Sequence, residues 1–201
     1  MSKQSIKLVV LVSGNGSNLQ AIIDAIAQDK LEATVRHVIS NRKDAFALQR
    51  AKQAGIDTSY FPLKPYTSDG RGRIRYDIDL AESINRLQPD LIVLAGWMHV
   101  LSVEFLRCIQ AKVINLHPAL PGQFAGTHAI ERAYEAFQRG EITHSGCMVH
   151  EVIPEIDAGT VIMQTDVPID AGDTLEQFEE LMHKTEHRLL VDAIRKIGQS
   201  L

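Results

Sequence analysis

Asn115 and His117 are the residues of this chain whose types and spacing point most directly to chemistry. They lie in an apolar, β-branched run that predicts a buried strand, on which residues two apart point to the same side. Pro118 ends this strand because proline has no N–H to donate to a neighbour. An amide can donate to a developing oxyanion, and an imidazole can move a proton near neutral pH. The sequence predicts a catalytic pair at a strand's carboxyl end, where α/β sheets bind ligands; the alternative is a polar pair that satisfies a loop.

The segment SGNGSN at residues 13–18 is a second candidate site, placed between an apolar run and a helical pattern. Ser17 and Gln20 have capping-box spacing, which places the start of a helix at Ser17. Glycines let a ligand approach the backbone, and the free N–H groups of a helix N-terminus favour phosphate. Leu19 stands where a G-x-G-x-x-G motif has its third glycine, and no Walker lysine follows. The segment predicts an anion cradle, with an ordinary tight turn as the alternative.

Two more segments could contact a ligand. Arg71, Arg73 and Arg75 close a loop that we predict over residues 62–72. Such a cluster is usually a solvated face, but forked guanidinium donors also suit a carboxylate. The segment WMHVL at residues 97–101 follows a buried strand. It is most simply part of the core, and it could instead line a slot for a flat ring.

Strands alternate with helices along the chain, which predicts an α/β domain with a mostly parallel sheet. The last two strands are joined by a short turn and are expected to pair antiparallel. Thr174 and Gln177 again have capping-box spacing, which predicts the start of the final helix. The predicted strands cover residues 6–12, 35–39, 58–61, 90–96, 113–116, 146–153 and 160–167. One predicted helix starts at residue 17, and another follows the arginine cluster and ends at about residue 87. The other predicted helices cover residues 44–54, 127–139 and 174 to about 197.

Composition excludes several classes of function. The chain has 201 residues, enough for one domain with a sizeable core, and a net charge of −4, which argues against a nucleic-acid-coating surface. Its two cysteines form no C-x-x-C pair, so a disulfide framework is not expected. No apolar run reaches the length of a membrane span or a signal segment. We therefore expect a cytoplasmic protein that binds neither membrane nor nucleic acid.

Three separated motifs resemble those of the folate-dependent formyltransferases: N-L-H-P at 115–118, E-I-D-A-G at 155–159, and the glycine segment at 13–18. The resemblance covers nearly the whole chain. It implies a single formyltransferase domain over residues 1–201 with a Rossmann-like three-layer fold, a mostly parallel sheet and an antiparallel C-terminal portion. It also implies transfer of the formyl group of 10-formyltetrahydrofolate to the amino group of glycinamide ribonucleotide, giving formylglycinamide ribonucleotide and tetrahydrofolate, a step of de novo purine (IMP) synthesis.

The resemblance also implies roles for individual residues. His117 would be the general acid, Asn115 the oxyanion donor beside the formyl group, and Asp157 the group that orients the imidazole and favours its cationic form. Glu186 would bind the ribose hydroxyls or the glycinamide end of the ribonucleotide. The remaining contacts would be made to phosphate by Gly16, Ser17 and Asn18, to the folate glutamate tail by Arg73, and to the pterin by Met98, His99, Val100 and Leu101. His99 stands where many members have arginine.

Other functions fit less well. A methionyl-tRNA formyltransferase or a formyltetrahydrofolate hydrolase would be expected to have added domains. The segment HKTEH at 183–187 matches the H-x-x-E-H of inverted zinc peptidases, but a third ligand is missing because only Asp192 follows, on the same helix. We therefore predict no metal. A non-catalytic nucleotide-binding module would leave the Asn115, His117 and Asp157 set without a purpose. A monomer and a homodimer are both compatible with the sequence.

Overall fold

The computed structural model describes residues 5–200, which divide into two compact units. The first unit extends to Ile114, and the second covers Asn115–Ser200. Within the described residues, the strands are hydrogen-bonded in the order β3-β2-β1-β4-β5-β6-β7. Strand β5 (Lys112–His117) contains the boundary between the units, so its last residues, including Asn115 and His117, belong to the second unit.

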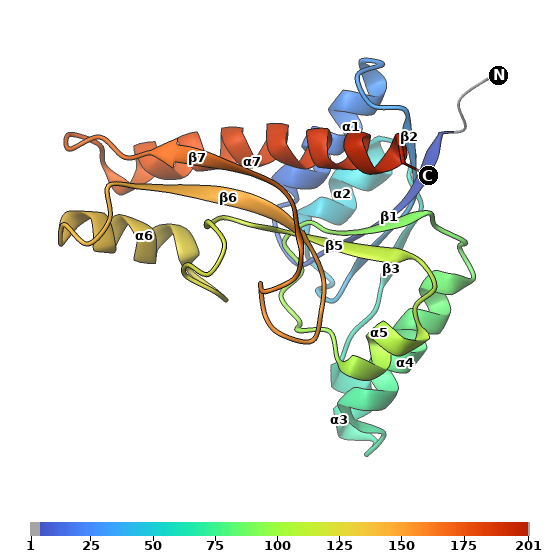
Figure 1. Ribbon diagram of the computed structural model, residues 1–201. Coiled ribbons are helices and arrows are strands. Elements are labelled where there is room, and N and C mark those ends of the chain that lie inside the picture. Colours follow the sequence, from blue (N-terminus) through green and yellow to red (C-terminus); the bar gives the residue numbers. More distant parts are fainter. Residues whose placement is uncertain (1–4, 201) are drawn as a thin grey trace. The chain divides into compact units, whose positions relative to one another are not determined.

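The first unit is built on parallel strands. Strand β1 (Ile6–Val12) pairs with β2 (Ala33–Ser40) and with β4 (Leu91–Leu94), and β2 pairs with β3 (Thr58–Tyr60). Both β1 and β4 are almost wholly buried, as continuous apolar runs in a doubly covered sheet should be. Figure 1 shows the helices of this unit on the two sides of its strands, α1 and α2 on one side and α3, α4 and α5 on the other. Their bounds are Ser17–Ala27, Phe46–Gln53, Lys64–Ser68, Gly72–Asn85 and Val103–Cys108.

The second unit contains an antiparallel strand pair with a long helix along it (Figure 1). Strands β6 (His144–Glu151) and β7 (Val161–Pro168) pair antiparallel, and α7 (Leu175–Gly198) packs on both. Thr174 begins α7 with the predicted capping box to Gln177. Helix α6 (Ala129–Gln138) follows β5 after a connection over residues 118–128, which we call the 118–128 loop.

The predicted fold class is confirmed, but two local predictions were wrong and one helix was missed. Gly16, with φ +79°, is the N-cap of α1, so Ser17 is the first helical residue and does not form the predicted capping box. The predicted loop over 62–72 contains helix α3, which has proline in its first turn. Helix α5 was not predicted, although Ser102 caps it by accepting from the Phe105 N–H. Elsewhere the predicted elements are present with ends shifted by up to two residues.

Within residues 5–200, no helix is long and apolar enough to cross a membrane. The single formyltransferase domain and the cytoplasmic location stay predictions.

Candidate active site

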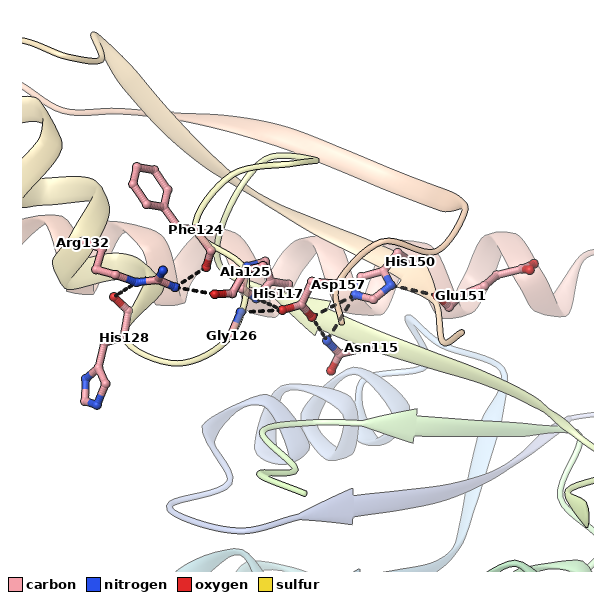
Figure 2. A network of polar contacts seen from close by, with 10 residues as sticks. All are labelled: Asn115, His117, Phe124, Ala125, Gly126, His128, Arg132, His150, Glu151 and Asp157. Atoms are coloured by element: carbon pink, nitrogen blue, oxygen red, sulfur yellow. Dashed lines mark hydrogen bonds and ion pairs between the residues drawn. The ribbon is translucent and has the colours of Figure 1, made fainter. Parts of the chain in front are cut away.

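Asn115, His117 and Asp157 lie together in the second unit (Figure 2). Asn115 and His117 point to the same side of β5, as their spacing predicts, and Asp157 comes from the connection between β6 and β7. The Asp157 carboxylate accepts from Asn115 Nδ2 at 3.1 Å, and its other oxygen lies 3.5 Å from His117 Nδ1. His117 is buried, with 4% of its surface exposed. An amide, an imidazole and a carboxylate therefore form one polar cluster.

His150, at the end of β6, is a member of this cluster that the sequence analysis missed. Its Nε2 atom lies 3.2 Å from Asn115 Nδ2 and 3.4 Å from an Asp157 oxygen. Its Nδ1 atom lies 2.8 Å from the Glu151 carbonyl oxygen. A carbonyl only accepts, so Nδ1 carries a hydrogen, and in neutral His150 the Nε2 lone pair accepts from Asn115. A histidine inside an apolar strand, seven residues before Asp157, is the sequence signal that could have found it.

The polar groups of Asn115 and His117 differ in whether they already have hydrogen-bond partners in the protein. Asn115 has two Nδ2 hydrogens, and acceptors stand in front of both: an Asp157 oxygen and His150 Nε2. His117 faces Asp157 with Nδ1, so this nitrogen is the one that carries the hydrogen in the neutral ring. His117 Nε2 is buried and has no hydrogen-bond partner within residues 5–200. It is therefore the nitrogen of the cluster whose hydrogen-bonding capacity is left for a substrate.

Burial and charge act in opposite directions on His117. Burial lowers its pKa, the Asp157 carboxylate raises it, and the result is a pKa below the usual value for histidine. The expectation that Asp157 favours the cation is correct in direction, but desolvation outweighs it. For Asp157, burial would raise the pKa, but the adjacent His150 ring, the Gly126 N–H and the His117 ring hold it below its usual range. At neutral pH the pair is a carboxylate beside a mainly neutral imidazole.

Two glycines allow the backbone to hold Asp157 in place. Asp157 itself has a positive φ of 52°, and the Gly126 N–H of the 118–128 loop donates to its Oδ2 at 2.9 Å. Gly159 lies directly against the Glu151 backbone, where an added Cβ would stand 1.8 Å from the carbonyl oxygen. That same carbonyl fixes the His150 ring. The close approach at Gly159 thus links the acidic loop to the end of β6.

The predicted phosphate segment lies in the first unit, between β1 and α1. Gly16 has φ +79°, and a Cβ there would stand 2.5 Å from the Ala47 Cβ of α2, so both conformation and packing require glycine. Arg50 of α2 holds the preceding residue by donating to the carbonyl and the side-chain oxygen of Asn15, each at 3.0 Å. The free N–H groups at the N-terminus of α1 therefore lie in a turn that is held in place by α2.

Arg73 lies beside the segment predicted to line the pterin slot, also in the first unit. Its Nε is 3.0 Å from both oxygens of the fully buried Asp77, and its Nη2 donates to the Val100 carbonyl. Arg73 is therefore partly committed to holding this segment. Met98 and Val100 are 58% and 54% exposed, whereas Leu101 is buried. Burial, with the charge of Arg73, lowers the pKa of His99, which stands edge-on to the Trp97 ring.

Glu186 is buried in α7 and lies 2.7 Å from His183 Nδ1. The carboxylate raises the pKa of His183. The zinc-motif residues His183 and Glu186 thus satisfy each other, and no group of three or more potential metal ligands occurs among the described residues. The absence of a bound metal stays a prediction.

The predicted site residues thus divide between the two units. Asn115, His117, Asp157 and Glu186 belong to the second, and Gly16, Ser17, Asn18, Arg73 and residues 98–101 belong to the first. The structure brings Asn115, His117 and Asp157 into one cluster and joins Arg73 to Val100.

A cluster of Asn115, the buried His117 and Asp157 of the acidic loop is consistent with the comparison to known proteins, in which residues 6–194 match the formyl transferase family. The chain belongs to this family, and it is an enzyme that transfers a one-carbon group.

Relatives of the chain point to one kind of formyltransferase. The phosphoribosylglycinamide formyltransferase of Schizosaccharomyces pombe is 54% identical over 198 residues, which are 94% of this chain and 96% of that protein. That of Escherichia coli is 42% identical, over 90% of this chain and 82% of the relative. The crystal structure of glycinamide ribonucleotide transformylase 1 from Symbiobacterium toebii has a TM-score of 0.88 at 34% identity and covers 98% of this chain and 89% of that chain. These relatives support phosphoribosylglycinamide formyltransferase activity in purine biosynthesis.

Proposed function

We propose that this enzyme transfers the formyl group of 10-formyltetrahydrofolate to the amino group of N1-(5-phospho-D-ribosyl)glycinamide, with the Asn115, His117 and Asp157 cluster as its catalytic centre. The observation that supports the proposal is the orientation of the His117 ring. Its Nδ1 faces the Asp157 carboxylate at 3.5 Å, and its buried Nε2 has no hydrogen-bond partner among residues 5–200. An imidazole oriented in this way presents one nitrogen to a substrate for proton transfer.

In the proposed reaction the acceptor amine attacks the formyl carbon, and the C=O oxygen becomes an oxyanion. The new C–N bond places a positive charge on the amine, and a proton passes from it to the lone pair of His117 Nε2. The C–N bond to the folate nitrogen then breaks, the carbonyl re-forms, and His117 returns the proton to that nitrogen as general acid. A pKa lowered by burial suits this order, because the ring starts neutral, and the Asp157 carboxylate stabilises the imidazolium between the two steps.

Asn115 is proposed as the oxyanion donor, and this role requires a change in its hydrogen bonds. Both Nδ2 hydrogens face protein acceptors in the free enzyme. An oxyanion would have to replace His150 Nε2 or the Asp157 oxygen in front of one of them. A full negative charge is a stronger acceptor than a neutral imidazole nitrogen, so the His150 contact is the one expected to yield. His150 is then a positioning residue, which holds the amide before the charge develops.

The binding roles are part of the same proposal. The N–H groups of Gly16, Ser17 and Asn18 would bind the ribonucleotide phosphate, because glycine and a helix N-terminus present free donors to an anion. Arg73 would bind the folate glutamate with the donors that its Asp77 and Val100 contacts leave over. Glu186, held by His183, would accept from the ribonucleotide hydroxyls or its glycinamide end. Met98, His99, Val100 and Leu101 would line the pterin slot.

The test is an assay of the purified protein with 10-formyltetrahydrofolate and glycinamide ribonucleotide, followed by folate absorbance and by the mass of the ribonucleotide product. The expected product is heavier than the acceptor by one formyl group in place of hydrogen, and it forms only when both substrates are present. A matched reaction with glycinamide lacking the ribosyl phosphate should be much slower, because the phosphate segment has nothing to bind. Folate turnover without the ribonucleotide would instead indicate a hydrolase, and no turnover would overturn the proposal.

A further inference from the structure

Arg132, on the first turn of α6, makes a set of contacts that the proposed function does not use. Its guanidinium donates to three backbone carbonyls of the 118–128 loop: Phe124, Ala125 at 2.8 Å, and His128 at 3.3 Å. Its charge also lies 5.9 Å from the centre of the Phe124 ring. A planar guanidinium presents five donors on separate nitrogens in a fixed geometry, whereas an ammonium offers three rotatable donors on one nitrogen.

The loop that Arg132 holds has an unfavourable backbone. Phe124 and His128, which carry side chains, have φ of 45° and 56°, and Gly122 and Gly126 are also in the left-handed region. Non-glycine residues take up this conformation only where their surroundings hold them in it. Two of the three carbonyls bound by Arg132 belong to these residues, Phe124 and His128. The guanidinium therefore acts at the points where the loop most needs support.

This support reaches the catalytic cluster through one residue. Gly126 directly follows Ala125, and its N–H is the backbone donor to Asp157 Oδ2 at 2.9 Å. The same carboxylate oxygen faces His117 Nδ1 at 3.5 Å. Figure 2 shows the chain of contacts from Arg132 through the loop to Asp157 and His117. All of these residues belong to the second unit.

We propose that Arg132 is a positioning residue for the catalytic centre: by binding the Phe124, Ala125 and His128 carbonyls it aims the Gly126 N–H at Asp157 and so fixes the carboxylate opposite His117. The inference rests on the proposed function for its kinetic consequence, but its structural part does not depend on any reaction. Arg132 does not contact the reacting atoms in this account. Its loss should misplace Asp157 while leaving the groups proposed to bind the substrates intact.

Arg132→Met tests this, because methionine keeps much of the apolar stem and removes every donor. The matched control is Arg139→Met at the C-cap of the same helix, where the exposed arginine pairs only with Glu135 and Glu141 in the described contacts. NMR would measure the exchange rate of the Gly126 amide hydrogen in both variants, and steady-state assays would give kcat and both KM values. In Arg132→Met we expect Gly126 exchange to be at least about 10-fold faster and kcat about 10–100-fold lower, since small misplacements of catalytic groups have effects of this size. Both KM values should stay within about twofold.

Unchanged Gly126 exchange in a folded Arg132→Met would overturn the proposal, whatever happens to kcat. So would equal losses in the Arg139→Met control. If Arg132→Met does not fold, Arg132→Lys replaces it. A Gly126 amide as protected as in the wild type would again overturn the proposal, because the single ammonium nitrogen of lysine cannot stand at both the Nε and the Nη2 positions from which Arg132 donates. If the wild type shows no formyl transfer, the proposed reaction fails, and the Gly126 exchange rate alone decides the role of Arg132.

Discussion

Replacing Asp157 by asparagine should lower the pKa of His117. Asparagine keeps the shape of the side chain and removes its charge, so the burial of His117 changes little while the group that favours the imidazolium is lost. In the wild type, burial already holds this pKa below the usual value for histidine, and the Asp157 carboxylate partly offsets that effect. The carboxylate is ionised at neutral pH, because its own pKa is below its usual range. The sign of the change is therefore downward.

The distance of 3.5 Å between His117 Nδ1 and the Asp157 oxygen sets the size of the effect. Two unit charges at this separation interact by about 1 kcal/mol with the dielectric constant of water and by about 5 kcal/mol at an effective value of about 20. An interaction of this size favours the imidazolium only while the carboxylate is present, so the pKa of His117 should fall measurably when Asp157 loses its charge. The acidic limb of kcat/KM should move to lower pH by the same amount, since the reaction begins with neutral His117.

NMR titration of the imidazole resonances in both proteins would measure this fall directly. His150 also faces Asp157, so the resonances of the two rings must be assigned separately. His183 is the internal control, because its partner is Glu186 and its titration should not move. An unchanged His117 pKa in folded Asp157→Asn would show that Asp157 is not its electrostatic partner, and the proton-transfer scheme would fail with it.

Three further substitutions test the supporting parts of the account. Gly16→Ala should raise the KM for the ribonucleotide by at least about 10-fold, because the added Cβ collides with α2. Gly55→Ala is the control, since Gly55 has a similar φ of 71° with open space around it, and this change should leave the KM unaltered. Equal effects of the two changes would refute the phosphate-binding role of the Gly16 segment. Gly159→Ala should lower kcat by a larger factor than it changes either KM, because the added Cβ pushes the acidic loop away from the Glu151 backbone. An unaltered kcat would contradict this expectation. Arg73→Ala should weaken folate binding and reduce the free energy of unfolding by about 3 kcal/mol, because the buried Asp77 carboxylate loses its ion pair and is left with the Ser102 N–H. Arg75→Ala, which removes an exposed pair, should cost at most about 1 kcal/mol. Equal losses in both would refute the packing role of Arg73.

The catalytic pair could be predicted from the sequence because its signal is local. Alternation along a strand brings Asn115 and His117 to one side, and proline marks the strand's end, so two short-range rules were sufficient. The Thr174 capping box was equally local. The same spacing at Ser17 gave the right helix start for the wrong reason, because a left-handed glycine took the N-cap position.

The partners of that pair depend on long-range geometry. His150 stands 35 residues from Asn115, and Gly126 stands 31 residues from Asp157, so neither contact has a periodic signal. The ion pair of Arg73 with Asp77 could have been predicted from their spacing of four residues on a helix. The hydrogen bond from Arg73 to the Val100 carbonyl could not. The effect of burial on His117 also required the packed structure, because charge alone predicts the opposite shift.

The rate of formyl transfer in a single turnover, measured for the wild type and for His117→Gln across pH, tests the central claim most directly. Glutamine preserves polarity and approximate size but cannot take up the proton of the amine. General acid–base catalysis contributes about 10²–10⁴-fold, so the rate should fall by that amount, and the acidic limb of the pH profile should disappear. A His117→Gln enzyme that transfers the formyl group within a few-fold of the wild-type rate, with the same pH limb, would contradict the assignment of His117 as the proton carrier.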